Sequence, residues 1–265
     1  MKNLLTTGFA LTTTLAGLLS VAAPANAFSW NNSWTQPTVQ TKAETGFDDT
    51  PFQQFVQAER VALPNIGQFV LNPEKLFLKF DHEVMVYFIN EGAGYRNQLA
   101  FEATGATNAT GLVFNDISSP ESILSESNGA LRKGDGVSLG TISGGTQLDF
   151  WLRANGFNGG TNIFGTQTES NLDRLQHVVA YAYQNFIILG FEDLYGALGA
   201  TGIDPLTGKM NERSDRDFND VVVVIDIGTA NLNHLMGVPE PSTVLALTGM
   251  TIVGIFGLRR KAKPA

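Results

Sequence analysis

The chain has 265 residues, of which only 16% are charged, and its formal net charge is −8 at pH 7. An excess of negative charge repels phosphate backbones, so the composition disfavours nucleic acid as a partner. The chain contains no cysteine, which excludes disulfide bonds, thiolate zinc sites and thiol catalysis. Its 28 glycines favour an all-β fold with many turns over a helical one.

Residues 1–27 have the three parts of a secretory signal peptide. Lys2 supplies the positive start, an apolar and threonine-rich stretch follows, and Ala25-Asn26-Ala27 forms a small-x-small cleavage site. We expect a signal peptidase to recognise Ala25 and Ala27 and to cleave after Ala27. An uncleaved membrane anchor is the alternative, and the threonines within the apolar stretch disfavour it.

Residues 28–65 are expected to form an N-terminal extension that carries one short helix. Pro51 suits the first turn of a helix, and Phe52, Phe55 and Val56 would give that helix one apolar face. We expect the helix to pack at one end of the domain that follows.

Residues 66–228 are predicted to form one all-β domain, a β-sandwich or jelly-roll-like fold. Short apolar runs separated by turn residues predict roughly nine to eleven strands. The expected strands cover residues 68–71, 76–80, 83–90, 95–103, 112–114, 131–141, 146–154, 177–184, 186–194 and 221–227.

Three finer expectations concern the middle of this domain. Residues 146–154 alternate between apolar and more polar side chains, a period of two that predicts a half-buried strand. One helical turn is expected within residues 116–128, and residues 155–165 are expected to form a glycine-rich loop.

A polar connector, residues 229–237, is expected to lead to a C-terminal sorting segment, residues 238–265. This segment contains Pro239-Glu240-Pro241, then an uncharged apolar span at residues 242–258, then the basic residues Arg259 and Arg260. The span is long enough for a short transmembrane helix. The basic residues would stay cytoplasmic and hold the folded domain outside the inner membrane.

This ordered arrangement resembles the PEP-CTERM sorting signal of bacterial exported proteins. The resemblance implies that an exosortase-type membrane protease removes the tail. The protein would then be anchored transiently in the inner membrane before it reaches the cell surface or the extracellular space. Proteins with this signal are associated with extracellular polysaccharide and biofilm. A simple single-span anchor is the alternative, and either interpretation implies export.

Oxygen-bearing side chains gather where two apolar runs, residues 186–191 and 221–227, meet the segment between them. These residues are Glu192, Asp193, Asp215, Asp217, Asn219 and Asp220. Because alternate residues of an extended strand share a face, we expect Asp215, Asp217 and Asn219 to point one way and Asp220 the other. Glu192 and Asp193 would join them if the two runs pair as neighbouring strands.

Buried carboxylates are unfavourable unless a cation or water lies among them. Hard cations prefer carboxylate and carbonyl oxygens, so we predict a Ca²⁺ site here. The spacing of Asp215, Asp217 and Asn219 matches the start of an EF-hand loop. Asp220 stands where that pattern has glycine, and a β-branched run follows, so we reject an EF-hand. The alternative to a metal is that these carboxylates cap turns and accept backbone N–H groups.

The sequence Phe191-Glu192-Asp193-Leu194, together with residues 214–222, resembles the signature of domain of unknown function 4114. Residues 88–97 and 136–155 resemble earlier blocks of that family, so the likeness spans about residues 67–228. The family occurs in bacterial exported and surface proteins and has no settled activity. Here a loop, residues 195–213, separates the two acidic halves.

Catalytic chemistry has little support in the sequence. Residues 136–140 match the G-x-S-x-G pattern, but another strand follows where a nucleophile elbow requires a helix. His82, His177 and His234 are too scattered to indicate a zinc site. A glycosidase needs two carboxylates at a set separation across a cleft, and the sequence singles out no such pair.

We therefore expect no enzymatic activity. We expect a structural or adhesive protein of the cell surface or extracellular matrix. The alternative is a carbohydrate-binding module for exopolysaccharide, in which Trp30, Trp34 or Trp151 could stack on sugars.

Overall fold

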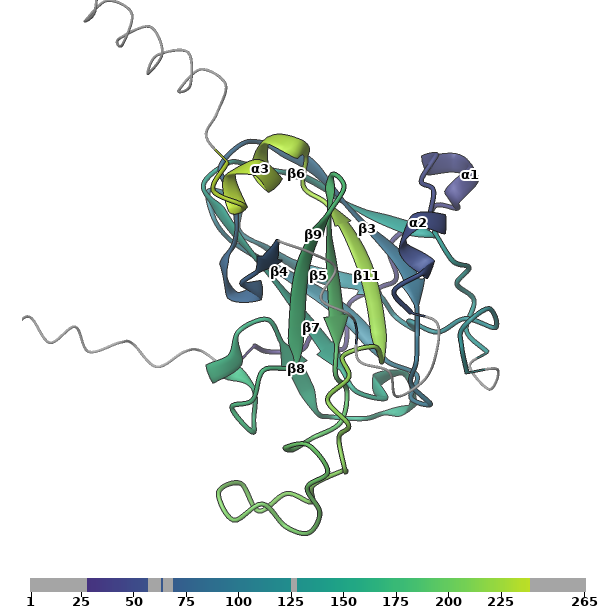
Figure 1. Ribbon diagram of the computed structural model, residues 1–265, viewed down its shortest axis with the longest axis vertical. Helices are drawn as coiled ribbons and strands as arrows, with labels where there is room; N and C mark the ends of the chain where they lie inside the picture. The colour runs from purple at the N-terminus through teal and green to yellow at the C-terminus, as the bar shows by residue number, and fades with distance from the viewer. Residues whose placement is uncertain (1–27, 57–62, 64–68, 125–127, 239–265) are drawn as a thin grey trace, which may run out of the picture.

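The computed structural model describes residues 28–56, 63, 69–124 and 128–238. These residues form two antiparallel β-sheets with few helices (Figure 1), which confirms the all-β prediction for the described part of the chain. None of the described helices is both long and apolar enough to cross a membrane. The predictions outside the described residues concern the signal peptide (1–27) with Ala25 and Ala27, Pro239, Glu240 and Pro241, the apolar span 242–258, and Arg259 and Arg260.

The described residues contain eleven strands and three α-helices. The strands are β1 Val70–Leu71, β2 Leu76–Leu78, β3 His82–Asn90, β4 Gln98–Gly105, β5 Ala109–Phe114, β6 Gly136–Ile142, β7 Thr146–Arg153, β8 Ile163–Gly165, β9 Val178–Tyr183, β10 Phe186–Phe191 and β11 Val221–Asp226. The helices are α1 Lys42–Thr45, α2 Thr50–Gln53 and α3 Thr229–Leu235. The larger sheet has the order β1-β9-β10-β11-β3-β6, and the smaller one has the order β2-β7-β4-β5, with β8 paired to β7.

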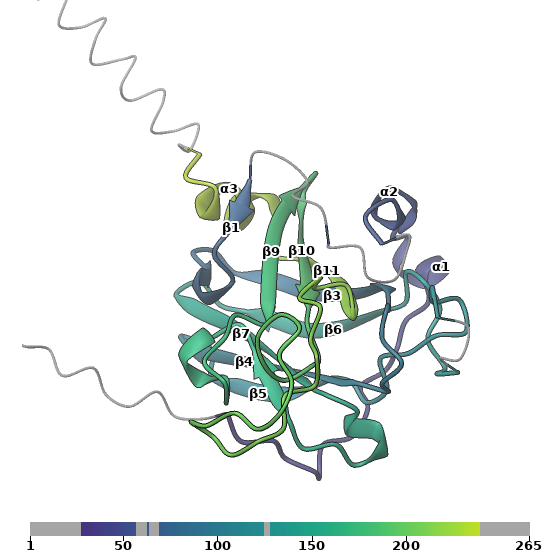
Figure 2. The same ribbon diagram turned by 60° about the horizontal axis from the view of Figure 1, so that its bottom comes forward.

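One apolar core joins the two sheets, which form separate layers in Figure 2. Phe88 of β3 and Val223 of β11 are buried in the same cluster as Leu99 of β4 and Phe150 of β7. Two antiparallel sheets that share a core agree with a β-sandwich. The hairpins β4–β5 and β9–β10 each stay within one sheet, and a jelly-roll-like connectivity stays a prediction.

The second half of the N-terminal extension covers the outer face of the larger sheet. Phe47 and Phe52 are buried against Tyr87 of β3 and Val224 of β11, and Phe47 stacks on Tyr87 with ring centroids 3.9 Å apart. Because both faces of β11 are covered, Val221 to Ile225 are all buried. The predicted helix forms as α2, but it lies over a sheet face and not at an end of the domain.

The strand β7 is more buried than its alternating sequence predicts. Asp149 and Trp151, expected on the open side, are both buried. Phe28 stacks on Trp151 with ring centroids 4.7 Å apart, and Thr166 donates a hydrogen bond to Asp149 at 2.8 Å. The expectation of a half-buried strand was wrong because segments distant in sequence cover its outer face.

Three of the described α-helices and strands were not predicted. The helix α1, Lys42–Thr45, lies in the N-terminal extension, where only one helix was expected, and it buries no side chain. The strand β8 lies in the expected glycine-rich loop, and three residues are too few to show a period. The helix α3 occupies the expected polar connector and buries Leu232 in the shared core. The helical turn expected within residues 116–128 is absent from the described part of that stretch, residues 116–124 and 128.

Asn231 attaches α3 to the chain after β2, so its removal should weaken the fold. Its Oδ1 accepts the N–H groups of Lys79 and Phe80 at 2.8 and 2.9 Å, and its Nδ2 donates to the Ile227 carbonyl at 2.8 Å. Buried groups left without partners are each destabilising by about 1–3 kcal/mol. We expect Asn231→Ala to lower the free energy of unfolding by about 2–3 kcal/mol in urea titrations. Asn233→Ala, at a partly exposed position of the same helix, should change it by less than about 0.5 kcal/mol; equal effects would contradict this role.

Candidate metal centre

Strand pairing brings the two acidic segments to one end of the larger sheet. The strands β10 and β11 are antiparallel neighbours, with Phe191 opposite Val221. Glu192 follows the first strand and Asp220 precedes the second, so the two residues leave the sheet side by side. The expected pairing of the two apolar runs is confirmed, and the loop between them extends from this end (Figure 1).

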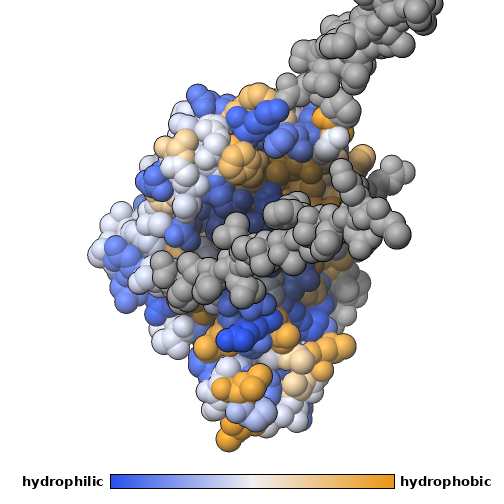
Figure 3. Space-filling model, turned by 90° about the vertical axis from the view of Figure 1, so that its left-hand side faces the viewer, coloured by the Kyte–Doolittle hydropathy of each residue, from blue (hydrophilic) through white to orange (hydrophobic). Residues whose placement is uncertain are grey.

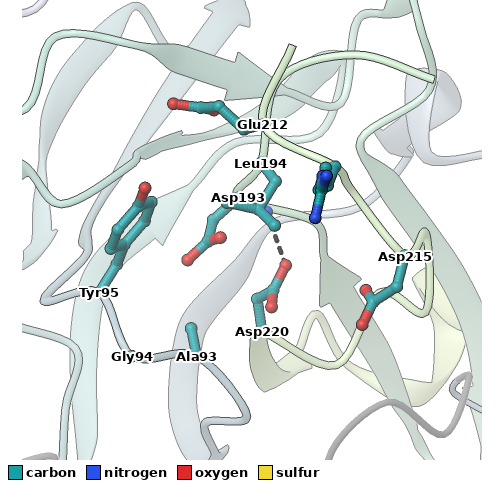
Figure 4. Close-up of a pocket in the computed structure, with 9 residues that line it drawn as sticks. Ala93, Gly94, Tyr95, Asp193, Leu194, Glu212, Asp215 and Asp220 are labelled. Carbon is teal, nitrogen blue, oxygen red and sulfur yellow. Dashed lines mark hydrogen bonds between the residues drawn. The ribbon is translucent and has the colours of Figure 1, made fainter. Parts of the chain in front are cut away.

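Three carboxylates converge at this end. Glu192, Asp217 and Asp220 are all buried, and each offers an oxygen that lies within 4.8 Å of the other two. Asp193 is also buried; its backbone N–H donates to Asp220 Oδ2 at 2.7 Å. Asp215 is partly exposed and stands apart from Asp193 and Asp220 in Figure 4. The structure thus brings together part of the predicted ligand set and leaves Asp215 outside it.

The segment before β11 is coiled and not extended. Arg213, Arg216 and Phe218 have φ values of 62°, 54° and 60°, in the left-handed region that non-glycine residues rarely adopt. The predicted alternation of faces was therefore wrong. Asp217 and Asp220, expected on opposite faces, meet because the backbone turns between them.

Asn219 helps to fix this turn. Its backbone N–H donates to Asp217 Oδ1 at 3.0 Å, and its carbonyl accepts the N–H of Gly92 at 3.0 Å. Its side chain is buried, and it lies in the same segment as Asp217 and Asp220. The alternative interpretation from the sequence was that these carboxylates cap turns. One oxygen of Asp217 does so, because it accepts the N–H of Asn219.

Glu192 is different, because its carboxylate is buried without a matching donor. The side chain is 0% exposed, and neither oxygen has a hydrogen-bond partner of normal geometry in the described chain. Burial raises the pKa of Glu192 to about 7, although the nearby Ser214 hydroxyl and the Arg216 guanidinium favour the charged form. A carboxylate buried in this way is stable only when a proton or a nearby cation neutralises its charge.

The neighbouring charges are mainly negative. Burial, followed by the charges of Asp193 and Glu192, raises the pKa of Asp220 well above its usual range. The guanidinium of Arg216 is the cation whose charge acts on Glu192, and its Nη2 already donates to the Gln176 carbonyl. One arginine cannot balance three or four buried carboxylates, so the arrangement favours an added positive charge.

A solvent-connected cavity of about 580 Å³ adjoins this cluster (Figure 4). Its lining includes the carboxylates of Asp193, Asp215, Asp220 and Glu212, the Tyr95 ring and one cation, Arg213. Hard cations such as Ca²⁺ take 6–8 oxygen ligands, several of which can be waters. Of the three converging carboxylates only Asp220 lines the cavity, so the cavity reaches the edge of the cluster and leaves room for waters there.

Residues 142–228 match the family model Domain of unknown function (DUF4114). Residues 237–261 match the PEP-CTERM protein-sorting motif. Comparison with curated proteins and with solved structures gives no significant match. The sorting motif supports export by an exosortase-type system, with transient membrane anchoring before the protein reaches the surface or extracellular space. Neither match is a catalytic family.

The DUF4114 match contains the converging carboxylates. It begins at residue 142, the end of β6, and extends to residue 228, beyond β11. The stretch at residues 88–97, which resembles an earlier block of the same family, lies outside the matched range. The matched part supplies β7 to β11, and the larger sheet also contains β1, β3 and β6, which precede it in the chain.

Within the DUF4114 region, a buried histidine holds the start of the long loop. His177 is 0% exposed, and its Nδ1 lies 2.9 Å from the carbonyl oxygen of Glu192. Its Nε2 lies 3.0 Å from Asp173 Oδ2, which also accepts the N–H of Gly196 at 2.9 Å. Burial opposes ionisation of Asp173, but these hydrogen bonds outweigh it and lower its pKa. No local pattern indicated this pair, because its role depends on contacts formed only after folding.

The long loop of the DUF4114 region projects from the domain and exposes apolar side chains. Tyr195 anchors it, since its hydroxyl bonds to Asp204 and Thr207. Its exposed apolar residues are Leu198, Ile203, Leu206 and Met210. Apolar surface is visible at the lower end of the molecule in Figure 3. The loop starts and ends at the acidic cluster, so the cluster holds its two ends together.

Proposed function

We propose that this chain is an exported structural or adhesive protein of the cell surface or extracellular matrix, with one stabilising Ca²⁺ ion in its β-sandwich domain. We propose that the carboxylates of Glu192, Asp217 and Asp220 are the main ligands of this ion. The observation that carries the proposal is the fully buried Glu192 carboxylate, which faces two other carboxylates and has no hydrogen bond of normal geometry in the described chain.

Further oxygens for the ion are available nearby. Asp193 and Asn219 are buried next to the three carboxylates, and Asp215 lines the adjoining cavity. Because Ca²⁺ accepts irregular sets of carboxylate, carbonyl and water oxygens, it fits this site better than Mg²⁺, which requires a near-octahedral set. The proposed partners during export are a signal peptidase and an exosortase-type membrane protease, and outside the cell they are extracellular polysaccharides.

Calorimetric titration of the full chain with calcium tests the metal proposal directly. The chain is purified in detergent, treated with a chelator and desalted before the titration. We expect one site of micromolar affinity, with protons released at pH 6 because bound carboxylates must be deprotonated. Glu192→Gln should abolish the binding heat, whereas Glu212→Gln, at a cavity-lining position outside the cluster, should keep it. Binding that survives in the Glu192 variant would place the ion elsewhere.

A further inference from the structure

Aromatic rings gather on the outer face of the smaller sheet, remote in sequence from the acidic cluster. Phe28 stacks on Trp151 of β7, and Trp30 and Trp34 lie edge to face with ring centroids 5.6 Å apart. The segment that carries Phe28, Trp30 and Trp34 runs along this sheet (purple in Figure 2). Gln36 fixes it there, because its Oε1 accepts the N–H that follows β5, at 2.6 Å.

Two of these rings, Trp30 and Trp34, border a cavity of about 390 Å³. Trp30 and Trp34 lie on one side, and Arg153 and Asn115 lie on the sheet side. The guanidinium of Arg153 lies 5.7 Å from the centre of the Trp30 ring, a contact that orients both groups. Although the chain is acidic overall, none of the described residues that line this cavity carries a carboxylate.

Most polar groups of the cavity present hydrogen-bond donors, and the exception is the buried Oε1 of Gln98, an acceptor without a partner in the described chain. The Oδ1 of Asn31 already accepts two bonds from Ser33. The Oδ1 of Asn32 accepts from Arg153 Nη1 at 2.8 Å, and that of Asn115 accepts a bond from Gln98 at 2.7 Å. Their amide nitrogens have no acceptor in the described part of the chain, and Arg153 keeps further N–H groups on Nη2. A ligand for this cavity should therefore be rich in acceptors.

We propose that this cavity binds a sugar unit of an acidic polysaccharide. The apolar C–H face of a pyranose ring can pack on an indole ring, while its carboxylate can accept paired hydrogen bonds from a guanidinium. Trp30 and Trp34 supply the first contact, and Arg153 with Asn115 supplies the second. The proposal rests on the polysaccharide partner proposed above, but it does not require the calcium site to be occupied.

Tryptophan fluorescence tests the proposal, because the three tryptophans of the chain, Trp30, Trp34 and Trp151, all belong to this cluster. The full chain in detergent is titrated with trigalacturonate in excess chelator, so that calcium cannot bridge sugar and protein. We expect a saturable change in emission, and affinity at least about tenfold weaker for the neutral maltotriose, because charged hydrogen bonds are lost. No saturable change, or equal affinity for both sugars, would overturn the proposal.

Two variants and one control locate the site. Asn115→Asp keeps the oxygen that accepts from Gln98 but replaces the free donor with a negative charge, and should weaken trigalacturonate binding at least about tenfold. Trp30→Ala, in the extension outside the core, should weaken binding of both sugars in calorimetry. Phe69→Ala removes an exposed ring next to β1 of the other sheet and should change neither. Wild-type affinity in both cavity variants would show that the sugar binds elsewhere.

Discussion

Calcium at 1 mM should raise the free energy of unfolding of the chelated protein by about 4 kcal/mol, if the ion binds only the folded state with a dissociation constant of about 1 µM. The folded state gathers Glu192, Asp217 and Asp220 within 4.8 Å, whereas an unfolded chain does not hold them together. The gain should therefore appear as a higher melting temperature and a higher urea midpoint in calcium than in chelator.

Variants in which one carboxylate is replaced by its amide identify which carboxylates cause the stabilisation by calcium. Asp217→Asn and Glu192→Gln each remove one charge from the converging group and should erase most of the calcium effect. Asp215→Asn is the matched control, because Asp215 is an acidic neighbour that is partly exposed and outside that group. If Asp215→Asn erased the effect while Asp217→Asn did not, the ligand set inferred from the geometry would be wrong.

The metal-free protein should lose stability as the pH rises from about 5 to 8, the reverse of ordinary acid denaturation. Burial raises the pKa of Glu192 from 4.5 to about 7, so between these values the folded state holds a proton that the unfolded state releases. A raised carboxyl pKa contributes stability below the unfolded value, and this contribution is lost as the pH passes the folded value. The shift corresponds to a loss of up to about 3 kcal/mol. Calcium should remove the loss, because the ion replaces the proton.

Thermal melts from pH 5 to 8, in calcium and in chelator, measure this effect. The difference between the two curves isolates the site from Asp149 and Asp135, whose pKa values burial also raises. In chelator at pH 8, Glu192→Gln should be more stable than the wild type by about 2–3 kcal/mol, because a neutral amide replaces an uncompensated buried charge. A difference between the calcium and chelator curves that does not grow with pH would show that the site carries no raised carboxyl pKa.

Strand periodicity and breaker residues were sufficient to predict most of the fold. The run before Glu192 and the β-branched run after Asp220 became the neighbouring strands β10 and β11. The strand β8 could not be predicted, because it owes its existence to pairing with β7. The helix α3 was not predicted either, because its stability depends on the burial of Leu232 and on the hydrogen bonds of the Asn231 side chain.

The candidate site was predicted in composition but not in geometry. The sequence places Glu192 and Asp220 at two strand ends, so their approach follows once those strands pair. The contact between Asp217 and Asp220 depends on left-handed backbone at Arg216 and Phe218, which no local pattern indicates. The supporting pair of Asp173 and His177 and the cavity wall at Tyr95 come from other parts of the chain.

The sequence by itself determined that this chain is β-rich, carries a PEP-CTERM sorting motif and places two acidic segments beside apolar strands; its N-terminal signal peptide stays a prediction. These are local features, written in composition, spacing and period. Only the tertiary structure decided that Glu192 is buried without a donor, and that the tryptophans of the extension cover the smaller sheet beside Arg153. Burial and charge balance depend on what the rest of the chain places around a residue, so they are properties of the folded molecule.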